Sequence, residues 1–196
     1  MNRIRQTAVA VAALVTAIAV TPALAQSDTL GVPGPVAFLG QDYNLSWTSQ
    51  PSEAYVKQEY VPAGQSPQTF TEMILVEAVS GDMTPMQAAA TQIKSLEARK
   101  PNDPVVNYQI IENEGAGEVM LDFVVSDLKA DPIIVEWNAY RYMRLADGNG
   151  VALFAVSRRG YGEEGARALL GSLTQVRAQV IKELATYSVP AIRMAP

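Results

Sequence analysis

The chain has 196 residues, of which 48% are apolar and 18% charged, and its formal net charge is −5. It contains neither cysteine nor histidine, which excludes disulfides, thiol nucleophiles, cysteine-ligated metal sites and a Ser-His-Asp triad. The acidic balance argues against nucleic-acid binding, because neutralising phosphates requires a basic face. We expect no cofactor and no bound metal.

The first 25 residues have the features of a signal peptide. Arg3 and Arg5 precede an apolar run over residues 7–20, which is shorter than the roughly 20 residues that a membrane-spanning helix needs. The run leads to Ala23-Leu24-Ala25, a small-x-small cleavage signal. We therefore expect cleavage after Ala25, a periplasmic protein and no membrane span after removal of the leader. The alternative is an uncleaved N-terminal anchor.

Residues 26–41 are rich in glycine and proline and predict a flexible lead-in. From Tyr43 onward, apolar and polar residues alternate, which predicts the first strand. Two further strands are expected at residues 54–61 and 71–79. Apolar residues on both faces of the last one place it inside the sheet, with one side covered by a helix.

The pair Thr84-Pro85 predicts the start of a helix, because threonine caps the helix and proline fits its first position. The prolines near residue 101 end it. Four strands follow, near residues 105–112, 118–128, 133–145 and 151–158. Apolar residues at helical spacing then predict a long final helix that ends before Pro190.

This order of elements, three strands, helix, four strands, helix, predicts an α+β fold. Short hairpin connections favour an antiparallel sheet of about six to seven strands with two helices packed against it. We expect a single domain over residues 42–188 and a C-terminal tail over residues 189–196.

The element order is similar to that of the Mog1/PsbP-like fold, known from small exported bacterial proteins and from PsbP proteins of the thylakoid lumen. The resemblance covers residues 42–187. It is carried by the strand at Tyr43-Asn44-Leu45-Ser46-Trp47, the helix start at Thr84-Pro85 and the long terminal helix from about Gly165 to Tyr187. It implies an adaptor-like role rather than catalysis, and it transfers no site residues, because fold alone does not fix function.

Five carboxylates are the most enzyme-like feature: Glu112, Glu114, Glu118, Asp122 and Asp127. Paired carboxylates serve glycoside hydrolysis or bind hard cations. The first three flank a hairpin turn, and Asp122 alternates out of phase with its apolar neighbours. A solvated strand face therefore explains them better than catalysis.

Arg158 and Arg159 lie next to glycines and just before a helix start, a pattern that suits a grip on an anion or carboxylate. The alternative is local salt bridging with Glu163 and Glu164. Because adjacent strand residues point to opposite faces, the two arginines cannot line one pocket unless a bulge intervenes.

Tyr140 and Tyr142 share one strand face, opposite to that of Trp137. With Arg144 they form our candidate contact surface, an aromatic platform on a face of the sheet that no helix covers. The alternative is that these rings cover the open face without a specific role.

The sequence favours an exported, non-catalytic protein that acts by protein–protein contact, as an accessory or adaptor of an unidentified envelope protein. The competing hypothesis is a small-ligand carrier or a carboxylate-dependent hydrolase. It requires Asp122 and Arg158 to converge in a cleft between the sheet and the helices.

Overall fold

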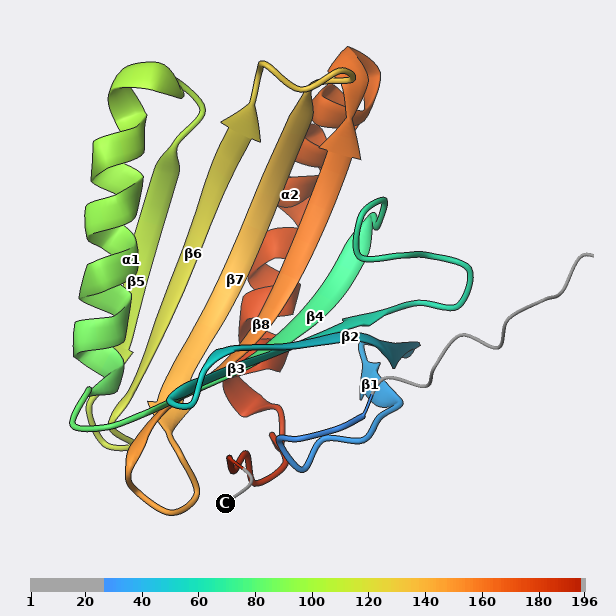
Figure 1. Ribbon diagram of the computed structural model, residues 1–196. Helices are drawn as coiled ribbons and strands as arrows, with labels where there is room; N and C mark the ends of the chain where they lie inside the picture. Colours follow the sequence, from blue (N-terminus) through green and yellow to red (C-terminus); the bar gives the residue numbers. More distant parts are fainter. Residues whose placement is uncertain (1–26, 195–196) are drawn as a thin grey trace, which may run out of the picture.

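The computed structural model describes residues 27–194, so the predicted signal peptide lies outside the described residues (Figure 1). Over these residues the fold is α+β, as predicted, with two α-helices and one eight-stranded antiparallel sheet, in the order β1-β2-β3-β4-β8-β7-β6-β5. The strands are β1 (Val36–Phe38), β2 (Gln41–Ser52), β3 (Tyr55–Val61), β4 (Glu72–Ser80), β5 (Asn107–Asn113), β6 (Glu118–Asp127), β7 (Ile134–Arg144) and β8 (Gly150–Tyr161). The helices are α1 (Pro85–Arg99) and α2 (Gly162–Thr186), and a short 3-10 turn, Lys100–Asn102, follows α1.

The helices pack on opposite faces of the sheet. Alternate residues of β8 point to opposite faces, and Leu153 belongs to the core beneath α1 whereas Phe154 belongs to the core beneath α2. Figure 1 shows α1 in front of the sheet and α2 behind it. The expectation that no helix covers the face of β7 carrying Tyr140 and Tyr142 is therefore wrong: the long strands lie between α1 and α2 in three layers. Both faces of β8 are apolar, with every residue from Gly150 to Ser157 buried, which explains why both must be covered.

The eighth strand, beyond the six to seven predicted, is β1. It lies in the segment expected to be a flexible lead-in, and the structure differs there from the expectation. Leu30 and Val32 are buried in the core beneath α2. The Tyr60 hydroxyl donates a hydrogen bond to the carbonyl of Val32 (2.5 Å), and the Gln58 amide donates to Asp28 (3.0 Å). Glycine and proline content marks irregular backbone but does not decide whether that backbone is packed.

The predicted C-terminal tail also packs onto the domain. Ile192 is buried in the same core as Leu30. The Arg193 amide donates to the carbonyl of Leu30 (3.1 Å), and the Ala146 amide donates to that of Ile192 (3.1 Å). Both ends of the described chain thus close one side of the α2 core.

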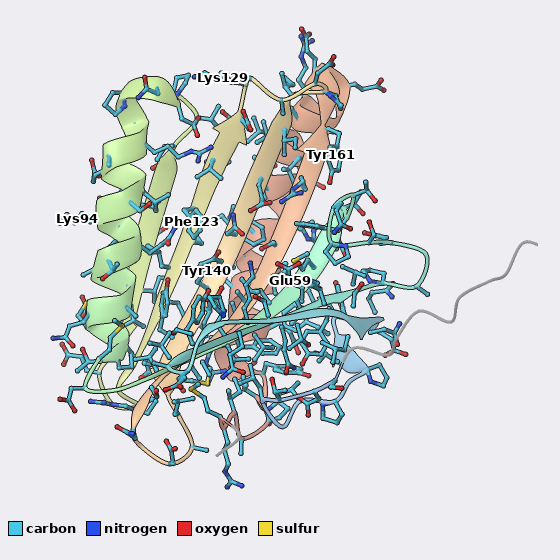
Figure 2. The ribbon with its side chains drawn as sticks, viewed as in Figure 1. Glu59, Lys94, Phe123, Lys129, Tyr140 and Tyr161 are labelled. Atoms are coloured by element: carbon cyan, nitrogen blue, oxygen red, sulfur yellow. The ribbon has the colours of Figure 1, made fainter. Side chains whose placement is uncertain are left out.

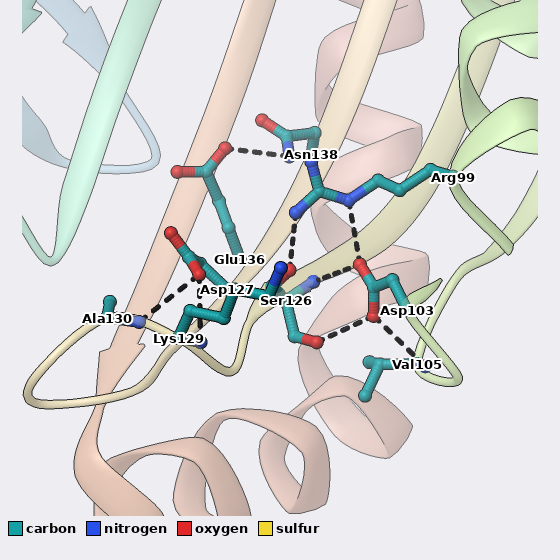
Figure 3. Close-up of polar contacts among 9 residues, drawn as sticks. All are labelled: Arg99, Asp103, Val105, Ser126, Asp127, Lys129, Ala130, Glu136 and Asn138. Atoms are coloured by element: carbon teal, nitrogen blue, oxygen red, sulfur yellow. Dashed lines mark hydrogen bonds and ion pairs between the residues drawn. The ribbon is translucent and has the colours of Figure 1, made fainter. Parts of the chain in front are cut away.

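Helix α1 is fixed at both ends. At its start, Thr84 and Gln87 form a reciprocal capping box. Past its end, the carboxylate of Asp103 accepts hydrogen bonds from Nε of Arg99 (2.8 Å), from the amide (2.7 Å) and hydroxyl (2.6 Å) of Ser126, and from the amide of Val105 (3.2 Å) (Figure 3). Burial alone would raise the pKa of Asp103, but these donors outweigh it and the pKa is lowered.

Helix α2 begins directly after β8, where the two backbones meet closely. A Cβ atom on Gly160 would lie 2.3 Å from the carbonyl oxygen of Gly165, so only glycine fits at this contact. Within the part of the chain that the structure describes, neither helix is long and apolar enough to cross a membrane.

Candidate functional site

A pocket of about 220 Å³ lies between α1 and the sheet; we call it the α1 pocket. Its walls are formed by β4, β7, β8, the loop before α1 and the first half of α1. The apolar lining residues are Val79, Met83, Ala88, Val151 and Leu153. The polar lining residues are Glu77, Thr91, Gln92 and Tyr142.

Glu77 is the one ionisable carboxyl group that lines this pocket. Burial raises its pKa, and Lys57 and a hydrogen bond from Tyr55 offset only part of that effect. Among the described residues Glu77 forms no ion pair, because the Lys57 ammonium lies 2.8 Å from Glu59 instead. The pocket therefore holds a desolvated carboxyl group that forms no ion pair among the described residues, although Lys57 lies opposite it on β3 and partly lowers its pKa.

The predicted platform residues Tyr140 and Tyr142 do lie on one face, opposite to Trp137, but they do not form an exposed surface. Tyr142 is only 6% exposed and lines the α1 pocket, and Tyr140 is half-buried. The Tyr140 ring packs edge-on against Phe123 and Tyr142, with centroids 4.8 and 6.0 Å apart. Figure 2 shows Phe123 on β6 and Tyr140 on β7, on the part of the sheet that lies beside α1. Burial raises the pKa of both tyrosines.

Arg144, the third platform residue, is exposed and lies at the end of β7. One of its guanidinium nitrogens donates to the carbonyl of Met83 (3.4 Å), in the loop before α1. The side chains of Met83 and Met86 are exposed (36% and 37%) around this point. Of the predicted contact surface, only Arg144 is exposed. We call Met83, Met86 and Arg144 the rim of α1; exposed methionines are typical of adaptable binding surfaces.

Arg158 and Arg159 form ion pairs with neighbouring strands rather than with Glu163 and Glu164. Arg158 pairs with Glu72 (3.0 Å), and Arg159 pairs with Glu136 (2.5 Å). The guanidinium of Arg159 also lies 4.0 Å from the centroid of the Phe70 ring, a cation–π contact. The predicted local salt bridges are therefore wrong, and Glu163 pairs with Arg167 instead.

Contrary to our expectation, both arginines line one cleft although no bulge separates them. Their partners on β7 are consecutive, Trp137 for Arg158 and Glu136 for Arg159. The cleft is broad, about 710 Å³, and extends past the strand to the loop before β4 and to α2, so it receives atoms from both faces. Within the described chain, Nε of Arg158 is buried without a hydrogen-bond partner.

Asp122 and Arg158 do not converge. Asp122 is 5% exposed, so its predicted solvated position is wrong. Its carboxylate accepts two hydrogen bonds from Arg177 of α2 (2.7 and 2.5 Å) and one from Trp137 Nε1 (3.4 Å). This cluster lines a recess on the β5–β6 side of α2, whereas Arg158 lines the cleft beside β4 and the first half of α2. The single cleft required by the hydrolase hypothesis is absent from the described residues.

The other candidate carboxylates are accounted for locally. Glu112 and Glu114 are exposed, as predicted. Glu118 pairs with Arg141 (3.0 Å), whose guanidinium also donates to carbonyl groups at the end of α2. Asp127 is exposed and accepts backbone hydrogen bonds within its own turn.

A protein-family model matches residues 30–189. The chain belongs to that family. The matched region includes all eight strands and both helices, and it starts at Leu30, inside the segment predicted to be a flexible lead-in. No curated protein and no solved structure matches the chain.

Sequence reasoning missed Glu77 as a site residue. The available signal was a single carboxylate in the otherwise apolar strand Met73–Val79. That pattern predicts a buried or partly buried charge, and buried charges need an explanation. The periodicity did not reveal that α1 would cover this face of the strand.

Proposed function

We propose that this protein is an exported, periplasmic, non-catalytic binding protein that contacts a partner in the cell envelope through the rim of α1. The observation that carries the proposal is the α1 pocket, which has the exposed Met83 in its lining, together with the exposed Met86, which lines a second recess with Arg144 at the start of α1. Sites for drug-sized ligands usually enclose about 300–1,000 Å³, so 220 Å³ fits one side chain of a partner better than a complete ligand. Interfaces concentrate binding energy in such anchor pockets.

A non-catalytic role is supported by the ion pairs of the residues that the hydrolase hypothesis and the arginine cleft would use, Asp122, Arg158 and Arg159. Asp122, Glu72 and Glu136 each pair with an arginine at 2.5–3.0 Å. Such pairs orient and neutralise the carboxylates, which general acid–base catalysis would need free to exchange protons with a substrate.

The alternative, a small-ligand carrier, would use the broader cleft at Arg158 and Arg159. Both arginines are already paired with carboxylates. An anionic ligand would therefore have to displace an existing ion pair and leave a partly buried carboxylate without its cation. The rim of α1 requires no such exchange.

The test is affinity capture from envelope extract with the double variant Met83→Glu/Met86→Glu. Leu170→Glu is the matched control, because Leu170 is equally exposed (39%) but lies on α2, on the other side of the sheet. We expect the recovery of a specific partner to fall at least tenfold with the double variant and to be unchanged with the control. Equal recovery with all three proteins would exclude the rim. Cell fractionation and N-terminal sequencing test export, for which a mature terminus at Gln26 is expected.

A further inference from the structure

We propose that the α1 pocket takes a lysine side chain of the partner protein, with its alkyl stem against the apolar walls and its ammonium group against the carboxylate of Glu77. This inference rests on the proposed function and identifies the chemistry of the anchor residue.

The shape and lining of the pocket suit a long apolar stem. Val151 and Leu153 are only 3% and 4% exposed and are held on the central strand β8, so this wall exists before binding. Met83 and Ala88 complete the apolar lining from the side of α1. A lysine side chain buries its methylene groups along such surfaces while its charge finds a polar partner.

The charge around Glu77 is complementary to an ammonium group. From β3, Tyr55, Lys57 and Glu59 act on Glu77, and from β7 Tyr140 and Tyr142 do so. The tyrosines are neutral at physiological pH, because burial raises the pKa of each. Two carboxylates therefore face one ammonium, that of Lys57, which pairs with Glu59. Lys57 lies opposite Glu77 in the β3–β4 register but pairs with Glu59, so among the described residues Glu77 has no cation within ion-pair distance.

A primary ammonium group fits the polar lining better than a guanidinium does. An ammonium is a compact charge with three donors, whereas a guanidinium is a wide planar group with five donors in fixed directions. Four side chains with oxygen atoms line the pocket, Glu77, Thr91, Gln92 and Tyr142, and its volume is only 220 Å³. An ammonium group is compact and its three donors can rotate, so it can reach acceptors on separate side chains in a small pocket.

The experiment titrates the purified protein with Nα-acetyl-lysine N-methylamide and follows the methyl NMR signals of Val79, Val151 and Leu153. The norleucine analogue, which has an uncharged side chain of similar length, reports the apolar contribution. We expect saturable shifts with the lysine probe and binding about fivefold weaker with norleucine, which corresponds to the upper end of the range for a partly exposed ion pair. The affinity of the lysine probe should fall as Glu77 becomes protonated on acidification.

Two variants separate the carboxylate from general charge effects. Glu77→Gln should weaken binding of the lysine probe by the same factor and remove its pH dependence. Glu53→Gln removes an exposed carboxylate in the β2–β3 turn and should change neither. Urea unfolding of Glu77→Gln checks that the variant is folded, and we expect full stability at neutral pH because a desolvated charge is removed.

Each contrary result overturns the inference. Equal binding of norleucine, no effect of Glu77→Gln, or the absence of saturable shifts with lysine refutes an ammonium site. Nα-acetyl-arginine N-methylamide is titrated in the same way, and tighter binding of it than of the lysine probe refutes the choice of lysine. These outcomes leave the proposed function intact if the Met83→Glu/Met86→Glu variant still loses its partner. Unchanged capture with that variant removes the proposed function, whatever the probe shows.

Discussion

The carboxylate of Asp103 is expected to contribute more to stability than any other single carboxylate of the α1 side, and Asp103→Ala tests this. Asp103 is 3% exposed and Ser126 is 4% exposed. The substitution leaves the amide and hydroxyl of Ser126 buried without an acceptor. At about 1–3 kcal/mol for each of these two buried unsatisfied groups, the loss is about 2–6 kcal/mol, and we take about 3 kcal/mol as the expected value. Arg99 adds little, because its side chain is 45% exposed and water replaces the lost partner.

Urea and thermal unfolding measure the effect, with Asp127→Ala as the matched control. Asp127 accepts two backbone hydrogen bonds in the adjacent turn (Figure 3) but is exposed, so its removal should cost less than about 1 kcal/mol. For a domain of this size, about 3 kcal/mol lowers the melting temperature by roughly 6–12 °C. Equal destabilisation by the two variants would refute the reasoning.

The lowered pKa of Asp103 also determines how the difference in unfolding free energy between wild type and Asp103→Ala depends on pH. Its folded-state pKa lies below the unfolded value, so the stabilisation is complete above the ordinary carboxyl range, about pH 4. It is lost as the pH falls through the folded-state pKa. The difference in unfolding free energy between wild type and Asp103→Ala should therefore decrease on acidification below pH 4 and stay constant between pH 6 and pH 8.

Two further substitutions test the α2 side. Arg177→Ala leaves the buried carboxylate of Asp122 with a single 3.4 Å hydrogen bond from Trp137. It should lower the free energy of unfolding in urea by about 2–4 kcal/mol. Adding Asp122→Asn should recover part of that loss, and no recovery would contradict the pairing. Leu30→Ala should cost about 2–5 kcal/mol, because Leu30 is fully buried. The free energy of unfolding of the exposed control Leu128→Ala should stay within about 0.5 kcal/mol of the wild-type value. A Leu30→Ala variant with an equally small loss would mean that residues 26–41 are not part of the core.

Local sequence patterns predicted most of the secondary structure. The alternation beginning at Tyr43 became β2, and the Thr84-Pro85 start became the capped first turn of α1. Turn residues separated β5 from β6 and β7 from β8 as expected. These predictions succeed because strand and helix periodicities act within one element.

The sequence did not predict which elements cover which face. Asp122 and Arg177 are 55 residues apart, and Asp103 and Ser126 are 23 apart. No local pattern links such residues, so Asp122 was assigned to a solvated face. The same limitation placed Tyr142 on an open surface, although α1 covers it. Each error concerns the packing of a helix onto a strand, which depends on the whole topology.

The contrast among the shielded carboxylates supports a binding role for Glu77. Asp103 and Asp122 are each saturated by donors from other elements, so the fold itself accounts for their charge. Glu77 lies on β4 between apolar neighbours, with a raised pKa and, among the described residues, no ion pair. An uncharged side chain of similar volume would avoid the cost of desolvating it. A desolvated carboxyl group kept at a cost to stability, in a pocket on the surface of the protein, supports the proposal that a partner protein supplies its cation.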